Sequence, residues 1–213
     1  MICFLINLYI ILEIIYKGEN FTVTLDSEYG RESGLVIYES LDDKSQRTYL
    51  KSADIDFFTD ICINWLPKDI DEEGEGSHHG EHYIAYTFYA ENMGQETINY
   101  WARIDIDDVI KNVDKAIRIM VYRNGERTIY ARPNERTGEA EKETVTEKFY
   151  SDTEVCLEQR TNFEPGQIDK FTIVVYLEGD DPDCVDELIG GELKMHMDIT
   201  EEHFIQETDN EIT

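Results

Sequence analysis

Three histidines form the densest group of metal-binding side chains in the sequence. His78, His79 and His82 lie within five residues of one another, with Glu81 among them. Neutral imidazole and carboxylate groups are typical zinc ligands. The segment follows an acidic, glycine-rich stretch at 71–76, whereas catalytic zinc ligands usually lie on rigid elements. Zinc binding and a solvated loop are therefore the two interpretations, and the sequence favours the loop.

Two groups of carboxylates could bind calcium, which prefers oxygen ligands. The spacing is not that of an EF-hand, but two such loops meeting at one end of a domain would repel each other unless a cation lay between them. The alternative is that these are simply polar turns. Calcium is the one cofactor that the sequence suggests, and no cofactor is certain. The two groups are Asp105, Asp107 and Asp108, and Glu178, Asp180, Asp181 and Asp183.

No motif predicts nucleophilic catalysis, since the sequence has neither Gly-x-Ser-x-Gly nor a cysteine-protease signature. With 47 acidic residues, chance pairs of carboxylates are no evidence for a glycosidase. We assign no catalytic residue. The cysteines are expected to be free and buried, with a Cys156–Cys184 bridge as the alternative, because a chain of this length needs no disulfide. Trp65 and Trp101 could stack on sugars or pack on a sheet.

The elements that must position these residues are β-strands, because apolar residues recur mostly with a period of two. Asn124-Gly125, between two such runs, predicts a two-residue hairpin loop, since both positions of that loop need positive φ. We also expect a hairpin between 83–90 and 98–106, a strand within 55–65, and a short helix capped by Asp107 or Asp108. Short strands separated by turns predict an all-β fold, an antiparallel, jelly-roll-like β-sandwich with at most one or two short helices.

Composition and charge narrow the function classes. The 213 residues carry a formal net charge of −28, which argues against nucleic-acid binding and against docking on anionic lipid headgroups. Hydrophobic residues make up 41% of the chain and aromatic residues 11%, enough to build a core. We therefore expect no nucleic-acid partner, and the sequence names no protein partner.

The chain divides into an apolar segment at 1–16, one β-sandwich domain at 17–204 and an acidic tail at 205–213. The apolar segment is shorter than the roughly 20 residues that cross a bilayer, and Asn7 and Glu13 interrupt it. Three interpretations stay open: the trailing part of a membrane anchor, a degraded signal or uncleaved anchor, or a buried first element of the domain. We expect the apolar segment to tether the chain to a membrane.

Three stretches, at 83–94, 170–184 and 189–195, resemble acidic surface proteins of Gram-positive bacteria. A strand running into Asn92-Met93-Gly94, and Pro165-Gly166 before a later strand, are similar to the camelysin and biofilm-matrix-fibre family. The resemblance implies a jelly-roll domain that is exported, with an extracytoplasmic location. It assigns no catalytic residue to this chain.

The sequence thus favours a non-enzymatic surface, adhesion or matrix-type protein that could self-assemble. An exported metal-dependent hydrolase, which the resemblance to camelysin implies, is one alternative. A carbohydrate-binding module that uses Trp65 or Trp101 is the other.

Overall fold

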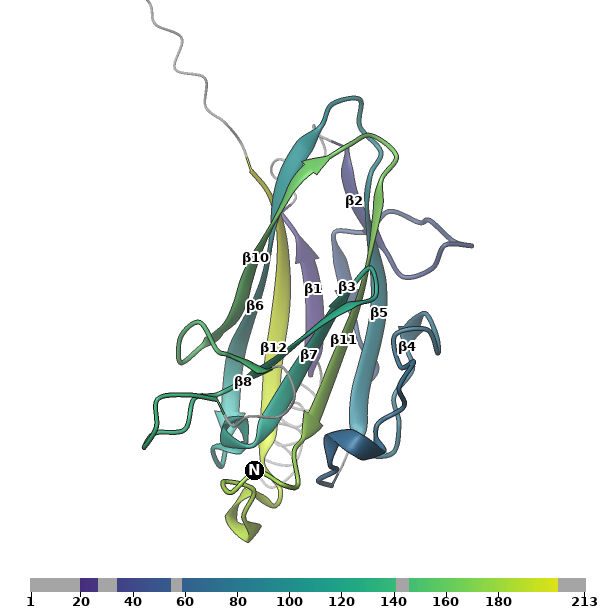
Figure 1. The fold of residues 1–213 in the computed structure, drawn as a ribbon. Helices are drawn as coiled ribbons and strands as arrows, with labels where there is room; N and C mark the ends of the chain where they lie inside the picture. Colours follow the sequence, from purple (N-terminus) through teal and green to yellow (C-terminus); the bar gives the residue numbers. More distant parts are fainter. Residues whose placement is uncertain (1–19, 27–33, 55–58, 141–145, 203–213) are drawn as a thin grey trace, which may run out of the picture.

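The chain folds into two β-sheets that pack face to face (Figure 1). The computed structural model describes residues 20–26, 34–54, 59–140 and 146–202. These residues are mostly strand, and the helical elements are single 3-10 turns, η1 (Ile63–Trp65), η2 (Val113–Lys115) and η3 (Asp186–Leu188). The predicted all-β sandwich is confirmed.

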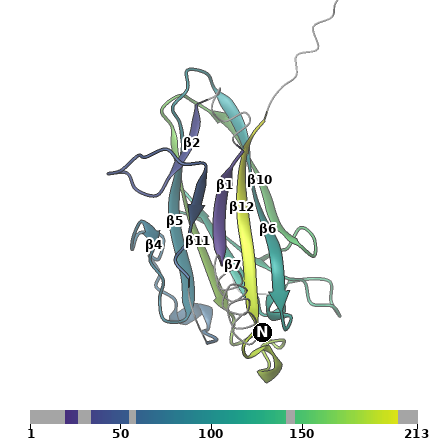
Figure 2. The ribbon, with the colours of Figure 1, turned by 180° about the vertical axis from the view of Figure 1, so that it is seen from behind.

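Sheet A is the five-stranded sheet, with strand order β10-β6-β12-β1-β3. Figure 2 shows β1, β12 and β6 side by side. The pairing is antiparallel except between β1 and β12, which run parallel. The strands of sheet A are β1 (Phe21–Leu25), β3 (Tyr49–Lys51), β6 (Ile98–Ile110), β10 (Glu154–Phe163) and β12 (Glu192–Glu201).

Sheet B is the seven-stranded sheet, with the order β2-β5-β11-β7-β8-β9 and with β4 paired to β5. Its pairs are antiparallel except for β8 and β9. In the turn between β7 and β8, Asn124 has φ 54° and Gly125 has φ 83°, so the predicted hairpin loop is confirmed. The strands are β2 (Leu35–Tyr38), β4 (Gly76–Ser77), β5 (Tyr83–Asn92), β7 (Ile117–Arg123), β8 (Glu126–Ala131), β9 (Thr146–Lys148) and β11 (Ile168–Leu177).

Alternating apolar side chains fill the space between the sheets. On β12, Leu193, Met195, Met197 and Ile199 point into this core, which leaves His196 and Asp198 on the outer face of sheet A. β5 is buried at every position. Its second face is covered because Leu66 and Ile70 pack with Tyr83 and Ala85 in a smaller core outside sheet B. Apolar residues at both parities of this strand therefore reflect packing on two sides.

Three local predictions are wrong. β5 and β6 do not form a hairpin, because β5 is already flanked by β2 and β11, and the short connection at 93–97 carries the chain into the other sheet. Asp107 and Asp108 cap no helix; both lie within β6, where tertiary pairing with β12 extends the strand to Ile110. Ile63–Trp65 is a 3-10 turn rather than strand, and residues 55–58 lie outside the described part.

A β-bulge occurs where β6 pairs with β12. Lys194 is opposite Asp108 and Met195 is opposite Ile106, so Asp107 is the extra residue. A bulge of this kind redirects side chains locally. As a result, both Asp107 and Asp108 lie away from the core between the inward-facing Ile106 and Val109.

A polar network joins the two sheets along one side of the sandwich. The Asp169 carboxylate on β11 accepts hydrogen bonds from the Tyr100 hydroxyl on β6 (2.5 Å) and from Arg160 Nε on β10 (3.0 Å). Asn124 Nδ2, in the hairpin turn of sheet B, donates a third (2.8 Å). Asp169 is only 2% exposed and Tyr100 is fully buried, so a single buried carboxylate connects both layers.

The predicted terminal segments at 1–16 and 205–213 lie outside the described residues. Among the residues that are described, none forms a helix of the length and apolar character that a membrane crossing needs.

Candidate functional site

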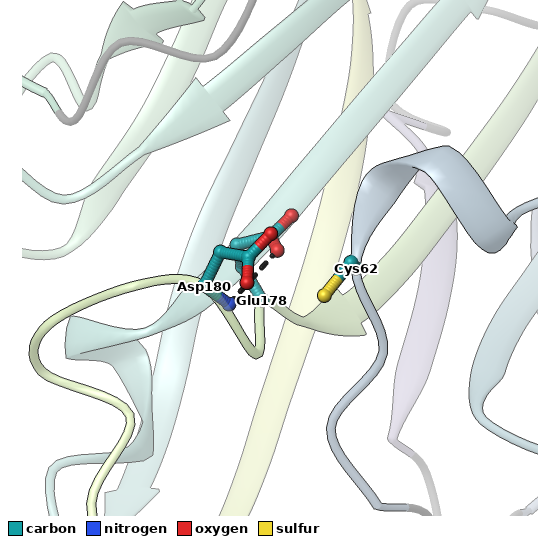
Figure 3. A group of neighbouring side chains, drawn as sticks. All are labelled: Cys62, Glu178 and Asp180. Carbon is teal, nitrogen blue, oxygen red and sulfur yellow. Dashed lines mark hydrogen bonds between the residues drawn. The ribbon is translucent and has the colours of Figure 1, made fainter.

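Two groups of metal-ligating side chains stand out in the described part of the chain. Each contains three residues whose ligand atoms all lie within 4.8 Å of one another. One group, Cys62, Glu178 and Asp180, lies at the end of β11 (Figure 3). We call it the loop cluster. The other, Asp105, His196 and Asp198, lies on the outer face of sheet A, and we call it the sheet cluster.

The loop cluster is positioned by backbone contacts between two segments. Ile61 N–H donates to Leu177 O (2.9 Å), and Gly179 N–H donates to Ile61 O (3.3 Å). These bonds hold the chain before η1 against the loop that follows β11. Figure 3 shows Cys62 on the first segment, facing Glu178 and Asp180 on the second.

Glu178 is fully buried and clamps these segments together. Its carboxylate accepts hydrogen bonds from Ile63 N–H (3.1 Å) and from Asp180 N–H (3.1 Å). Hydrogen bonds from backbone N–H groups to a buried carboxylate are charge-assisted and therefore strong. Glu178 thus has a structural role whether or not a cation binds beside it.

The electrostatics of the loop cluster keep the Cys62 thiol protonated. Its hydrogen bond to Asp180 and, secondarily, burial and the surrounding carboxylates raise the pKa of Cys62 to about 11. Burial, with nearby Asp60 and Asp181, also raises the pKa of Cys184. A neutral thiol is a poor nucleophile. A thiophilic cation could still bind here by displacing the proton.

Cys62 is therefore expected to react slowly with iodoacetamide. Raising a thiol pKa from 9.0 to about 11 lowers the thiolate fraction at pH 8 about 100-fold. A thiolate of higher pKa is also intrinsically more nucleophilic, and this offsets about ten-fold of the loss. We expect alkylation at pH 8 to be about ten-fold slower than for an unperturbed thiol, measured at the Cys62 peptide by mass spectrometry. Asp180→Asn should accelerate it; equal rates in the two proteins would contradict this account.

Next to the loop cluster, Asp181 forms a buried ion pair. Arg118 Nη2 lies 2.6 Å from Asp181 Oδ2, and the two side chains are 0% and 1% exposed. Asp183 N–H donates to Asp181 Oδ1 (2.7 Å). The structure thus gives the Asp181 carboxylate a cationic partner already, and this pair holds the loop after β11 on the sheet.

The sheet cluster is positioned by cross-strand pairing. His196 on β12 is opposite Asp105 on β6. His196 Nε2 lies 3.6 Å from Asp105 Oδ2 and 3.5 Å from Asp198 Oδ2, while Nδ1 lies 2.8 Å from Asp107 Oδ1. Arg103 also contacts both carboxylates, with Nε 2.7 Å from Asp105 Oδ2 and Nη2 2.9 Å from Asp198 Oδ2.

The residues predicted for calcium therefore fall into separate places. Asp105 belongs to the sheet cluster, with Asp107 beside it and Asp108 next along β6. Glu178 and Asp180 belong to the loop cluster, and Asp181 and Asp183 follow them on the loop. Among the described residues, no group of three ligand atoms within 4.8 Å combines the two predicted sets.

The three predicted zinc histidines have different partners. His78 Nε2 lies 2.8 Å from Thr87 Oγ1, and His82 Nδ1 lies 2.8 Å from Thr59 Oγ1. His79 Nε2 lies 2.8 Å from Ala53 O, and its Nδ1 accepts from Ala85 N–H (3.0 Å). Neither of the two clusters in the described part includes any of these imidazoles.

Sequence reasoning missed Cys62, His196 and Asp198. The alternation along 192–199 places His196 on the face opposite Met195 and Met197, but only strand register reveals its partner. The sequence predicts buried free thiols. Cys156 is free and buried, whereas Cys62 and Cys184 are free and half-buried. The described cysteines thus form no Cys156–Cys184 bridge.

The two tryptophans differ in exposure. Trp65, on η1, is 80% exposed. Trp101 lies on β6 between Gln159 and Thr200 of the neighbouring strands and is half-buried.

Comparisons with known proteins give no assignment. No protein-family model matches the sequence, and no curated protein matches it. The β-glucosidase from Kluyveromyces marxianus in complex with glucose matches with a TM-score of 0.26 and 11% identity, covering 76% of this chain and 15% of that chain. Its selenomethionine-labelled form matches with a TM-score of 0.25 and 13% identity, covering 76% and 16%. The chain thus spans a small part of these proteins, and TM-scores this low carry no functional argument.

Proposed function

We propose that this chain is a non-enzymatic surface, adhesion or matrix-type domain that acts outside the cytoplasm and is held at a membrane through residues 1–16. One observation carries the proposal. The start of β1 is directed toward the end of the sandwich at which β12 begins, and that end exposes large apolar side chains.

A backbone hydrogen bond of Asn20 locates the start of β1. Met195 N–H donates to Asn20 O (3.0 Å), so β1 begins beside Met195, three residues after the start of β12, and runs parallel to it. η3 and the residues leading into β12 lie at the same end, with Val185 48% and Ile189 65% exposed. η1, which carries the 80% exposed Trp65, lies near this end as well, because Ile61 N–H, just before η1, donates to Leu177 O at the end of β11 (2.9 Å).

Exposed apolar side chains cost free energy in water unless a partner or a membrane covers them. A net charge of −28 gives the domain no electrostatic attraction to anionic headgroups. Attachment would therefore come from apolar contacts and the tether, while the acidic surface keeps neighbouring copies apart unless cations screen them.

Cell fractionation tests this proposal. The full chain with a C-terminal epitope tag, expressed in a Gram-positive host, should sediment with membranes and be degraded by protease added to intact cells. Ile10→Lys combined with Ile11→Lys should release it from the membrane fraction, because two charges disrupt the apolar segment. A wild-type protein that stays in the cytosol, protected from protease, would refute the proposal.

The exposure of Trp65 favours a second candidate function, carbohydrate binding. An indole that is 80% exposed offers a face on which a sugar ring can stack. If so, the full chain should be retained on insoluble polysaccharide such as cellulose, chitin or peptidoglycan, and Trp65→Ala should lose retention. Tyr150→Ala is the matched control, since Tyr150 is an aromatic residue 72% exposed elsewhere. Equal retention of both variants would remove this candidate.

A further inference from the structure

We propose that Asp105, His196 and Asp198 form a binding site for a divalent transition metal such as zinc, and that the Arg103 guanidinium competes with the metal for the two carboxylates. The site is independent of the function proposed above. It uses two residues, His196 and Asp198, that the sequence does not connect with Asp105.

The proposed ligands project from two adjacent strands in the interior of sheet A. β6 is flanked by β10 and β12, and β12 by β6 and β1. Asp105 is opposite His196, and Arg103 is opposite Asp198. Ligands on paired strands are held more rigidly than ligands on loops, and rigid placement favours metal binding.

The bulge in β6 adds an orienting residue. Asp107 Oδ1 lies 2.8 Å from His196 Nδ1. A carboxylate accepts but does not donate, so Nδ1 carries a proton, and in the neutral imidazole the lone pair that can bind a metal is then on Nε2. Histidines that bind metals through one nitrogen commonly donate from the other to a carboxylate, which fixes the tautomer and the ring orientation.

The distances from His196 Nε2 to the two carboxylate oxygens fit a tetrahedral ion, and all three ligand atoms lie within 4.8 Å of one another. His196 Nε2 lies 3.6 Å from Asp105 Oδ2 and 3.5 Å from Asp198 Oδ2. Both distances are long for hydrogen bonds. Around a tetrahedral zinc ion with bonds of about 2.1 Å, neighbouring ligands are about 3.4 Å apart. Three protein ligands leave a fourth position open, which water or a partner's ligand can take.

The charges also favour a cation. Asp105, Asp107 and Asp198 surround His196, and Glu154 of β10 is opposite Asp105. Thr24 of β1 donates to Asp198 Oδ1, which leaves Oδ2 for another partner. Among these groups Arg103 brings the one permanent positive charge, against four carboxylates, so a divalent ion would reduce their repulsion.

Arg103 contacts the same two oxygen atoms that would bind the metal. Its Nε is 2.7 Å from Asp105 Oδ2 and its Nη2 is 2.9 Å from Asp198 Oδ2. Its side chain is 45% exposed, so it can turn toward solvent when a metal displaces it. Metal binding must therefore break these contacts, which lowers the affinity of the native chain.

The ligand set indicates the class of metal. One imidazole and two carboxylates suit zinc and its neighbours in the first transition row. Calcium and magnesium prefer oxygen ligands alone. This site is thus distinct in chemistry from the calcium site expected from the carboxylates of the sequence.

Titration of the full, EDTA-treated chain with Co²⁺ and Zn²⁺ tests the proposal, with visible absorption and calorimetry as readouts. The control background is Cys62→Ser, which removes the thiol of the loop cluster. In that background we expect one equivalent of Co²⁺ with the strong absorption of a tetrahedral site. His196→Gln and Asp105→Asn should abolish it, and Asp107→Asn should weaken binding 10- to 100-fold.

Arg103→Gln is the decisive variant, because a merely structural role for the cluster does not predict its effect. We expect it to raise Zn²⁺ affinity at least ten-fold. Thermal melts in EDTA check that each variant is folded. If His196→Gln or Asp105→Asn does not fold, Asp198→Asn replaces it as the variant that removes a ligand. No saturable binding by either the native chain or Arg103→Gln would overturn the proposal. So would binding that His196→Gln leaves unchanged, or saturable binding of Ca²⁺ without Zn²⁺.

Discussion

Asp181→Ala is expected to lower the free energy of unfolding by about 3–5 kcal/mol. Asp181 is the partner of Arg118 in a salt bridge of 2.6 Å, and both side chains are almost completely buried. The substitution removes a carboxylate from a buried guanidinium where water does not reach, and breaking one side of a buried ion pair costs far more than the intact pair contributes. The measurement is urea unfolding followed by circular dichroism.

A double variant separates the cost of breaking the buried ion pair on one side from the loss of packing. Arg118→Met with Asp181→Ala removes both charges, so it should be more stable than Asp181→Ala alone. Lys115→Ala is the control, since Lys115 pairs with Glu135 at the surface, and it should leave the unfolding midpoint unchanged. If Asp181→Ala costs less than about 1 kcal/mol, the pair is not the buried clamp inferred from its geometry.

Asp169→Ala is expected to destabilise the protein by about 2–4 kcal/mol. The carboxylate joins the sheets by accepting hydrogen bonds from Tyr100, Arg160 and Asn124. Without it, the buried Tyr100 hydroxyl has lost its acceptor and pays the full desolvation cost. Arg160 loses less, because its side chain is 28% exposed and also bonds to Gln167.

A double-mutant cycle with Tyr100→Phe measures the coupling across the sheets. Removing both the hydroxyl and the carboxylate should cost less than the sum of the single variants, because neither partner is then left unsatisfied. The free energies of unfolding come from urea titrations of the four proteins. Additive effects would show that Tyr100 and Asp169 do not depend on each other, contrary to the contact described.

The all-β sandwich could be predicted because alternation of apolar residues is a local property of a strand. Asn124-Gly125 fixed one hairpin for the same reason: both residues need positive φ, and the turn joins neighbouring runs. The predicted hairpin between β5 and β6 is wrong because alternation of apolar residues does not identify the strand with which a strand pairs. β5 pairs with β11, whose residues are about 80 positions away in the chain.

The candidate sites show the same limit. Carboxylates such as Asp105, Glu178 and Asp180 could be named from their residue types. Their neighbours could not be named in this way. His196 lies 91 positions after Asp105 and meets it only because their strands pair, and Cys62 meets Glu178 through contacts between two loops. Composition supplies the chemistry of a site, whereas long-range pairing decides which groups share it.

The parallel pairing of β1 with β12 sets the order in which this protein can fold. Residues 21–25 are hydrogen-bonded beside residues 195–199, so the first described strand waits for the last. A ribosome or a secretion channel that still holds the C-terminal part of the chain therefore prevents sheet A from closing. Contacts of such high sequence separation fold slowly. Sheet A of the nascent chain therefore stays incomplete until residues 195–199 have been synthesised, and a chain whose sheet is incomplete is easier to unfold for passage through a translocation pore.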